Sequence, residues 1–152
     1  MPKYRLLSKD ELENLEPEFI QYLSSNGIDA EKWKSILKDD KNEMDFHIKL
    51  FSDVVMQKTL EKINYLEHRT SSDIKLFYFD KTEASLFALK STSIDLLEVS
   101  SINQNDLENI ELYNATKKYN STRELEIFDL LNQGCTISKG DLFYQLKQFI
   151  KK

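Results

Sequence analysis

The chain has 152 residues, with 26 acidic and 21 basic side chains and a formal net charge of −5. A chain of this length can bury one core, so we expect a single domain over residues 1–152. The acidic balance argues against a nucleic-acid backbone as the main partner, and no apolar run of about 18 residues is present to cross a membrane.

The first 40 residues are predicted to form short helices. Ser8 and Glu11 have the spacing of a capping box, and Pro17 suits the first turn of a second helix. Gly27 is expected to end that helix with a positive φ, and Asp29 can cap a third helix. This part of the chain is therefore predicted to be almost wholly helical.

The longest predicted element is one helix from Asp40 to His68, a stretch without proline or glycine. One apolar stripe follows helical spacing, and its members are Met44, Ile48, Phe51, Val55 and Leu66. A flanking face carries Leu50, Val54 and Tyr65. A helix that is apolar on several sides is covered on several sides, so it is either the central helix of the domain or partly buried against a second copy of the chain. In the second case this flanking face is the candidate interface.

A small antiparallel sheet is predicted after residue 69. Residues 74–79 and 84–89 are rich in aromatic and aliphatic side chains, and a polar connection of four residues joins them into a hairpin. Residues 94–99 are either a third strand or a short helix that Ser93 caps. The long helix is the expected cover, because two strands alone are marginal.

The C-terminal third is predicted to be helical again, with a helix from Asn105 or Asp106 through Tyr113. Residues 121–133 form a second helix that ends at Gly134, and Ser138 caps a last one, so 121–152 is a candidate helical-hairpin subdomain. The hairpin resembles a helix-turn-helix, with an ordinary helical hairpin as the alternative. In the DNA-binding interpretation the groove would meet Lys139, Tyr144, Gln145, Lys147 and Gln148.

These elements predict an α+β fold that is mostly helical, with one long central helix and a small antiparallel sheet, either a hairpin or three strands. A low glycine content, three residues in all, favours this class over a barrel.

Strong catalytic and metal-binding motifs are absent from the sequence. Glu43 and His47 are four residues apart and share a helix face, so both could reach one ion, but an exposed polar pair is the favoured interpretation. Asp53, Glu67, His68 and Arg69 form a polar cluster only if another segment closes on them; His68 and Arg69 fit the end of a helix. We therefore predict no catalytic, metal-binding or cofactor-binding residue and no cofactor.

Three strings carry a family resemblance: YRLLSKDEL at 4–12, FSDVV at 51–55 and YLEHR at 65–69. They are similar to the landmarks of a conserved bacterial family of unknown function. The resemblance implies no activity and no site residue.

The first functional hypothesis is a non-enzymatic protein-interaction module that associates with itself or with another protein, since apolar surface is in excess and no convergent polar set is visible. The alternatives are a DNA-binding regulator that uses the C-terminal hairpin and a hydrolase that uses carboxylates with His47 or His68. The single cysteine, Cys135, and an N-terminus without a long apolar core predict a cytoplasmic protein.

Overall fold

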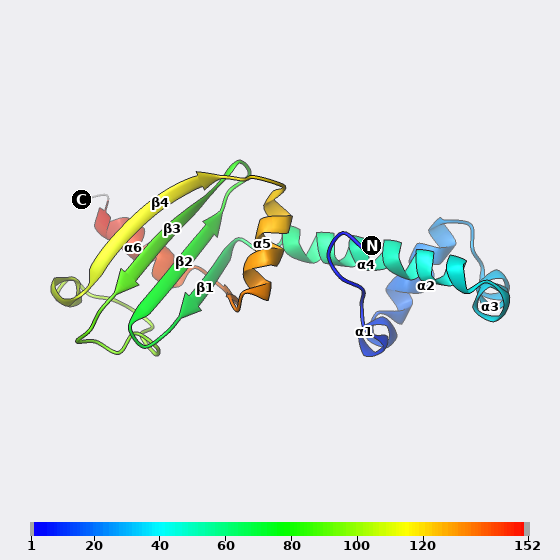
Figure 1. The fold of residues 1–152 in the computed structure, drawn as a ribbon, viewed down its shortest axis with the longest axis horizontal. Coiled ribbons are helices and arrows are strands. Elements are labelled where there is room, and N and C mark those ends of the chain that lie inside the picture. Colours follow the sequence, from blue (N-terminus) through cyan, green and yellow to red (C-terminus); the bar gives the residue numbers. More distant parts are fainter. Residues whose placement is uncertain (1, 151–152) are drawn as a thin grey trace. The chain divides into compact units, whose positions relative to one another are not determined.

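The computed structural model of the chain describes residues 2–150. Contacts between residues divide the chain into two compact units, Met1–Thr59 and Leu60–Lys152, which we call the helical unit and the sheet unit (Figure 1). Each unit has its own buried residues and is described by itself. That residues 1–152 form a single domain stays a prediction. The two units are the compact parts within that range.

Helices make up the helical unit, and their predicted caps are present. The Ser8 side chain accepts the Glu11 amide while the Glu11 carboxylate accepts the Ser8 amide, and Gly27 has a φ of 75°. The Asp29 carboxylate accepts the Lys32 amide. The helices are α1 (Lys9–Asn14), α2 (Glu16–Ser25), α3 (Ala30–Asp39) and α4 (Lys41–Glu61), the last two residues of α4 belonging to the sheet unit.

Side chains from α2, α3 and α4 form the core of the helical unit. Phe51 is buried, with its ring 4.9 Å from that of Phe19 and 5.5 Å from that of Tyr22. The segment before α1 is tied to α4, because the Leu7 amide donates to Ser52 Oγ at 3.0 Å and the Lys3 amide to Asp53 Oδ1 at 2.9 Å. Leu23, Ile28 and Ile36 form a further buried cluster, with Trp33 and Met44 packed against it.

The predicted long helix is wrong in its last part. α4 ends at Glu61, and Tyr65–Arg69 forms strand β1 instead. In β1, Tyr65 pairs with Tyr78 and Leu66 pairs with Phe77. Each of these β1 side chains therefore lies opposite an aromatic residue that is on the same face of the sheet as itself. Cross-strand packing of this kind overrides a local preference for helix.

A five-stranded antiparallel sheet forms the centre of the sheet unit, in the order β4-β3-β2-β1-β5 (Figure 1). The predicted hairpin is confirmed as β2–β3, but the prediction of a sheet with only two or three strands is wrong. Residues 94–99 are not a strand, although Leu96 in that loop is fully buried. The strands are β1 (Tyr65–Arg69), β2 (Asp73–Phe79), β3 (Glu83–Lys90), β4 (Glu111–Lys118) and β5 (Thr136–Ser138).

The predicted helix from residue 105 to Tyr113 is also wrong. A 3-10 turn, η1 (Asp106–Asn109), is followed directly by strand β4. Leu112 pairs with Leu89 of β3, and Tyr113 pairs with Ala88. Sheet pairing with a strand more than twenty positions earlier therefore decides the conformation here, and local spacing does not show it.

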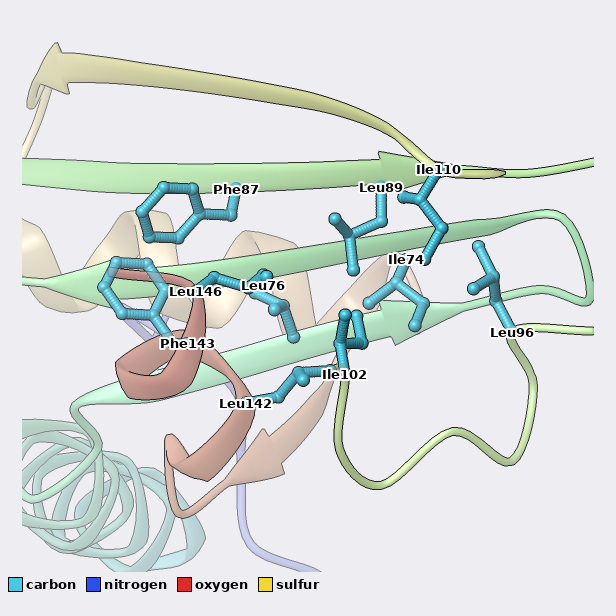
Figure 2. Packing of buried hydrophobic residues seen from close by; sticks show 10 residues of the cluster. All are labelled: Ile74, Leu76, Phe87, Leu89, Leu96, Ile102, Ile110, Leu142, Phe143 and Leu146. Atoms are coloured by element: carbon cyan, nitrogen blue, oxygen red, sulfur yellow. The ribbon is translucent and has the colours of Figure 1, made fainter. Parts of the chain in front are cut away.

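The two faces of the sheet meet different helices. Ile74 and Leu76 of β2 point to the face that α6 (Asp141–Ile150) covers, where the ring of Phe143 lies 4.6 Å from that of Phe87 (Figure 2). Phe77 and Phe79 alternate onto the opposite face, beside α5 (Arg123–Asn132). Strand β5, paired with β1, separates the two helices. The two predicted C-terminal helices are therefore present but do not form a helix-turn-helix, and Ser138, the predicted cap of the last helix, lies in β5.

Candidate functional site

The most prominent surface feature is a row of apolar side chains on α4. Phe46, Leu50 and Val54 are spaced four residues apart, so they lie on one side of the helix, and they are 53%, 37% and 42% exposed. We call these three residues the α4 stripe. On the inner side of the same helix Phe51 is only 3% exposed. The structure therefore distinguishes a covered side of α4 from an apolar side that faces water.

Two of the three predicted interface residues belong to this stripe. Leu50 and Val54 are exposed as the prediction requires, whereas Tyr65 lies in β1. The Tyr65 ring is half-buried, and its centroid lies 5.1 Å from that of the Tyr78 ring and 5.8 Å from that of the Phe143 ring. Phe46 was not among the predicted residues, although its position four residues before Leu50 is a signal visible in the sequence that it shares their side of the helix.

A hollow of about 330 Å³ lies between α2 and α4, beside the stripe. Val54 belongs to both features, so the hollow opens next to the stripe. Tyr22, Phe51 and Val55 give the hollow apolar walls, while Glu18 and Lys58 supply charges. The arrangement offers burial for an apolar side chain.

Glu43 and His47 approach each other as predicted, but they do not form an exposed pair. His47 Nε2 lies 3.7 Å from Glu43 Oε1, the Tyr22 hydroxyl lies 3.4 Å from His47 Nδ1, and His47 is buried. The rings of Trp33 and Phe46 lie edge-on to the imidazole. Among the described residues no group of three or more potential metal ligands exists, so this pair has no third protein ligand there.

The other predicted polar residues do not converge. Asp53 accepts amides at the start of the helical unit, whereas Glu67, His68 and Arg69 are consecutive residues of β1 in the sheet unit. Glu67 and Arg69 form an ion pair of 3.3 Å on one face, and His68 alternates onto the other. His68 and Arg69 therefore do not end a helix, and Arg69 instead donates to the carbonyls of Leu96 and Val99.

Three of the five predicted groove residues, Tyr144, Lys147 and Gln148, share one face of α6, and Lys139 lies in the loop before it. Tyr144, Lys147 and Gln148 are exposed, as is Lys139, while Gln145 accepts the Ile102 amide at 2.9 Å. Gln145 thus has a structural partner within the sheet unit. DNA binding and hydrolysis both stay predictions.

A second, larger hollow of about 530 Å³ lies between α5 and the sheet face opposite α6, and no sequence pattern predicted it. Its floor is apolar, while Glu126 on its wall accepts the Asn120 amide at 3.1 Å and lies 3.8 Å from Lys117 Nζ. Tyr119 nearby has its pKa raised to about 12, chiefly by burial. The lining contains no histidine or cysteine; its apolar members are Phe77, Phe79, Ala84, Leu86, Ala115 and Leu130.

Fold and surfaces together define an α+β protein with a helical unit, a five-stranded antiparallel sheet and an exposed apolar helix stripe. The chain belongs to DUF6495, a family of unknown function, which matches residues 1–151. This confirms the expected membership of an uncharacterised family. No curated protein and no solved structure matches the chain. Within residues 2–150, no helix has both the length and the apolar character to cross a membrane.

Proposed function

We propose that this protein is a non-enzymatic interaction module that self-associates through the α4 stripe. The observation that supports the proposal is the row Phe46, Leu50 and Val54, which leaves three large apolar side chains in water along one side of a helix. Full burial of one such side chain is worth about 1.5–3 kcal/mol. Because the three side chains are already about half covered, a partner that buries the rest gains on the order of half of that value for each, a few kcal/mol in total.

A second copy of the chain fits this stripe. Two α4 helices that pack antiparallel about a two-fold axis at Leu50 place Phe46 of each copy beside Val54 of the other, because both residues are four positions from Leu50. The same patch is then used twice. Such an isologous contact closes as a dimer.

The hollow between α2 and α4 gives Phe46 of the second copy a place to insert. Val54 borders the hollow, so a phenyl ring that lies against Val54 also reaches the walls made by Tyr22 and Phe51. An aromatic side chain in an apolar recess is the usual anchor of a protein interface. In the proposed dimer, Phe46 of each copy thus inserts into the hollow of the other copy.

Sedimentation velocity over a range of concentrations tests the proposal. Wild type is expected to show concentration-dependent self-association, and Val54→Lys is expected to remove the part of it that uses the α4 contact, because the substitution buries an unpaired charge there. The separated Val54→Lys chain should keep its helical circular dichroism, since Val54 is exposed in the single chain.

Thr59→Lys is the matched control, because it adds the same charge at an exposed position about 140° around the same helix from Val54. It should leave the dimer intact. A strictly monomeric wild type, or a Val54→Lys chain that dimerises as wild type does, would overturn the proposal. Unfolding of Val54→Lys at every concentration would instead place Val54 in the internal core.

A further inference from the structure

Strand β4 is a long edge strand of the sheet, and only one of its two sides is paired with another strand. It has eight residues, all paired one-to-one with β3 on one side, and it is the terminal strand in the sheet order. Seven of its eight residues are exposed. The strand lies at one edge of the sheet (Figure 1). The opposite edge strand, β5, has only three residues.

Natural sheets protect edges of this length with charged side chains, a proline, a bulge or a very short strand, since the free backbone groups otherwise pair with another chain. β4 lacks proline and has no bulge in its register with β3, and its charged residues, Glu111, Lys117 and Lys118, are confined to its two ends. The strand therefore offers a template for one further antiparallel strand.

The charges along β4 are complementary to those of a reversed copy of the same strand. The strand begins with Glu111 and ends with Lys117 and Lys118. The existing pairing with β3 already uses this arrangement, because Glu111 lies opposite Lys90 and Lys118 lies opposite Glu83. A second β4 that runs antiparallel presents the same sequence of charges.

Sheet geometry limits the registers that two β4 strands can adopt. A two-fold axis perpendicular to the sheet keeps each face on its own side, so opposed residues must come from the same face. An axis at Asn114 pairs Glu111 with Lys117 of the second copy at both ends of the contact. It also pairs Tyr113 with Ala115 and Leu112 with Thr116.

The neighbouring registers lose these charge pairs. An axis at Ala115 sets Tyr113 opposite Lys117 and leaves Glu111 beyond the end of the partner strand. An axis at Tyr113 sets Glu111 opposite Ala115. Of these three registers, only the one centred on Asn114 pairs Glu111 of each copy with Lys117 of the other.

We infer that two copies of this chain join their sheets edge to edge through β4, in the register centred on Asn114. The two five-stranded sheets then form one continuous antiparallel sheet. Lys117 is free to turn toward the second copy, because its present pair with Glu126 is 3.8 Å long and the lysine side chain is 64% exposed. The contact is separate from the α4 stripe and does not depend on it.

Charge reversal tests this contact in the full chain that carries Val54→Lys, so that the α4 stripe does not contribute. Glu111→Lys and Lys117→Glu each turn two attractive pairs into two repulsive ones. Each should raise the dimer dissociation constant on the order of tenfold or more. The double variant Glu111→Lys, Lys117→Glu restores opposite charges and should restore the dimer. A double variant as weak as either single variant would overturn the inference.

Cysteine cross-linking gives a second readout that tolerates a weak dimer. In the proposed register Asn114 faces its own copy across the axis at a Cα separation of about 4.5–5.5 Å, which a disulfide spans. Asn114→Cys should therefore form a covalent dimer on mild oxidation. Thr116→Cys, whose copies lie about 13 Å apart along the strands, should not.

The Val54→Lys chain without an added cysteine, which holds only the buried Cys135, is the oxidation control. Equal cross-linking of Asn114→Cys and Thr116→Cys, or none at Asn114→Cys, would overturn the register and the contact. Because these measurements use Val54→Lys, loss of the α4 dimer and loss of the β4 dimer are seen separately.

Discussion

A β-carbon added to Gly140 would lie 2.6 Å from the ring of Tyr65. Gly140 has a φ of 85° and stands just before α6, while Tyr65 lies in β1. The contact joins the start of α6 to the sheet, where the Tyr65 ring also packs against Phe143. Glycine is required here by the close approach and by the backbone conformation together.

Gly140→Ala should therefore destabilise the sheet unit by about 3 kcal/mol or more, since the left-handed conformation costs about 1–2 kcal/mol and the overlap with Tyr65 adds to it. Gly134→Ala is the matched control: its φ is 105°, but its nearest neighbour, the His68 ring, would be 3.9 Å away. Urea unfolding followed in the sheet unit measures both. Equal losses in the two variants would show that the Tyr65 contact carries no energy.

The sequence predicts those elements whose signal is local. Capping at Ser8 and Asp29, the turn at Gly27 and the β2–β3 hairpin each depend on residues a few positions apart, and each is found. β1 and β4 were mistaken for helix because their apolar residues also fit helical spacing over short runs. What makes them strands is pairing with residues far along the chain.

The surface features divide in the same way into those with a local sequence signal and those that depend on distant residues. Exposure of Leu50 and Val54 was predictable from the excess of apolar residues on one helix. The hollow beside α5 was not, because it arises where β2, β3 and β4 meet a helix that follows them in the chain. Separation of α5 and α6 by β5 was equally invisible, since a strand of three residues carries almost no periodic signal.

Arg123 fixes the start of α5 to the chain around β1. Its guanidinium donates to the carbonyls of Leu60, Ile63 and Phe79, and its side chain is 13% exposed. Arg123→Lys keeps the charge but lacks the planar guanidinium that donates to three carbonyls at once. The substitution should therefore lower the free energy of unfolding by roughly 2 kcal/mol. Lys139→Ala, an exposed site in the same unit, should change stability by less than about 0.5 kcal/mol. Similar unfolding midpoints for both variants would contradict the proposed role of Arg123.

Glu11 should titrate far below an ordinary glutamate. Its hydrogen bonds to the Arg5 guanidinium and then to the Ser8 amide lower its pKa from 4.5 to about 2. A lowered pKa in the folded state means that the stabilisation is complete above pH 4.5 and is lost as the pH falls toward 2.

Nuclear magnetic resonance of the Glu11 carboxyl carbon measures this directly. The signal should stay flat down to about pH 3, and Arg5→Gln should move its titration upward toward the ordinary value. An unchanged titration in Arg5→Gln would remove Arg5 as the cause.

Cys135 should be an inert thiol in the folded protein. It is buried, and burial raises its pKa above the ordinary 9.0, an effect that Lys75 only partly offsets. Little thiolate therefore exists at neutral pH, and iodoacetamide should react slowly until urea unfolds the sheet unit. Rapid alkylation of the native chain at pH 7.5 would be inconsistent with this burial.

The last prediction separates the two sides of α4. Phe51 is 3% exposed and contacts Phe19 and Tyr22, so Phe51→Ala leaves a cavity and should cost about 3–5 kcal/mol. Val54→Ala, on the exposed stripe, removes little buried surface and should leave monomer stability within about 0.5 kcal/mol while it weakens self-association. Urea unfolding at a concentration where wild type is monomeric measures the first effect, and sedimentation measures the second. If Val54→Ala destabilised the monomer as strongly as Phe51→Ala, both sides of α4 would be internal, and no stripe would remain for a second copy to cover.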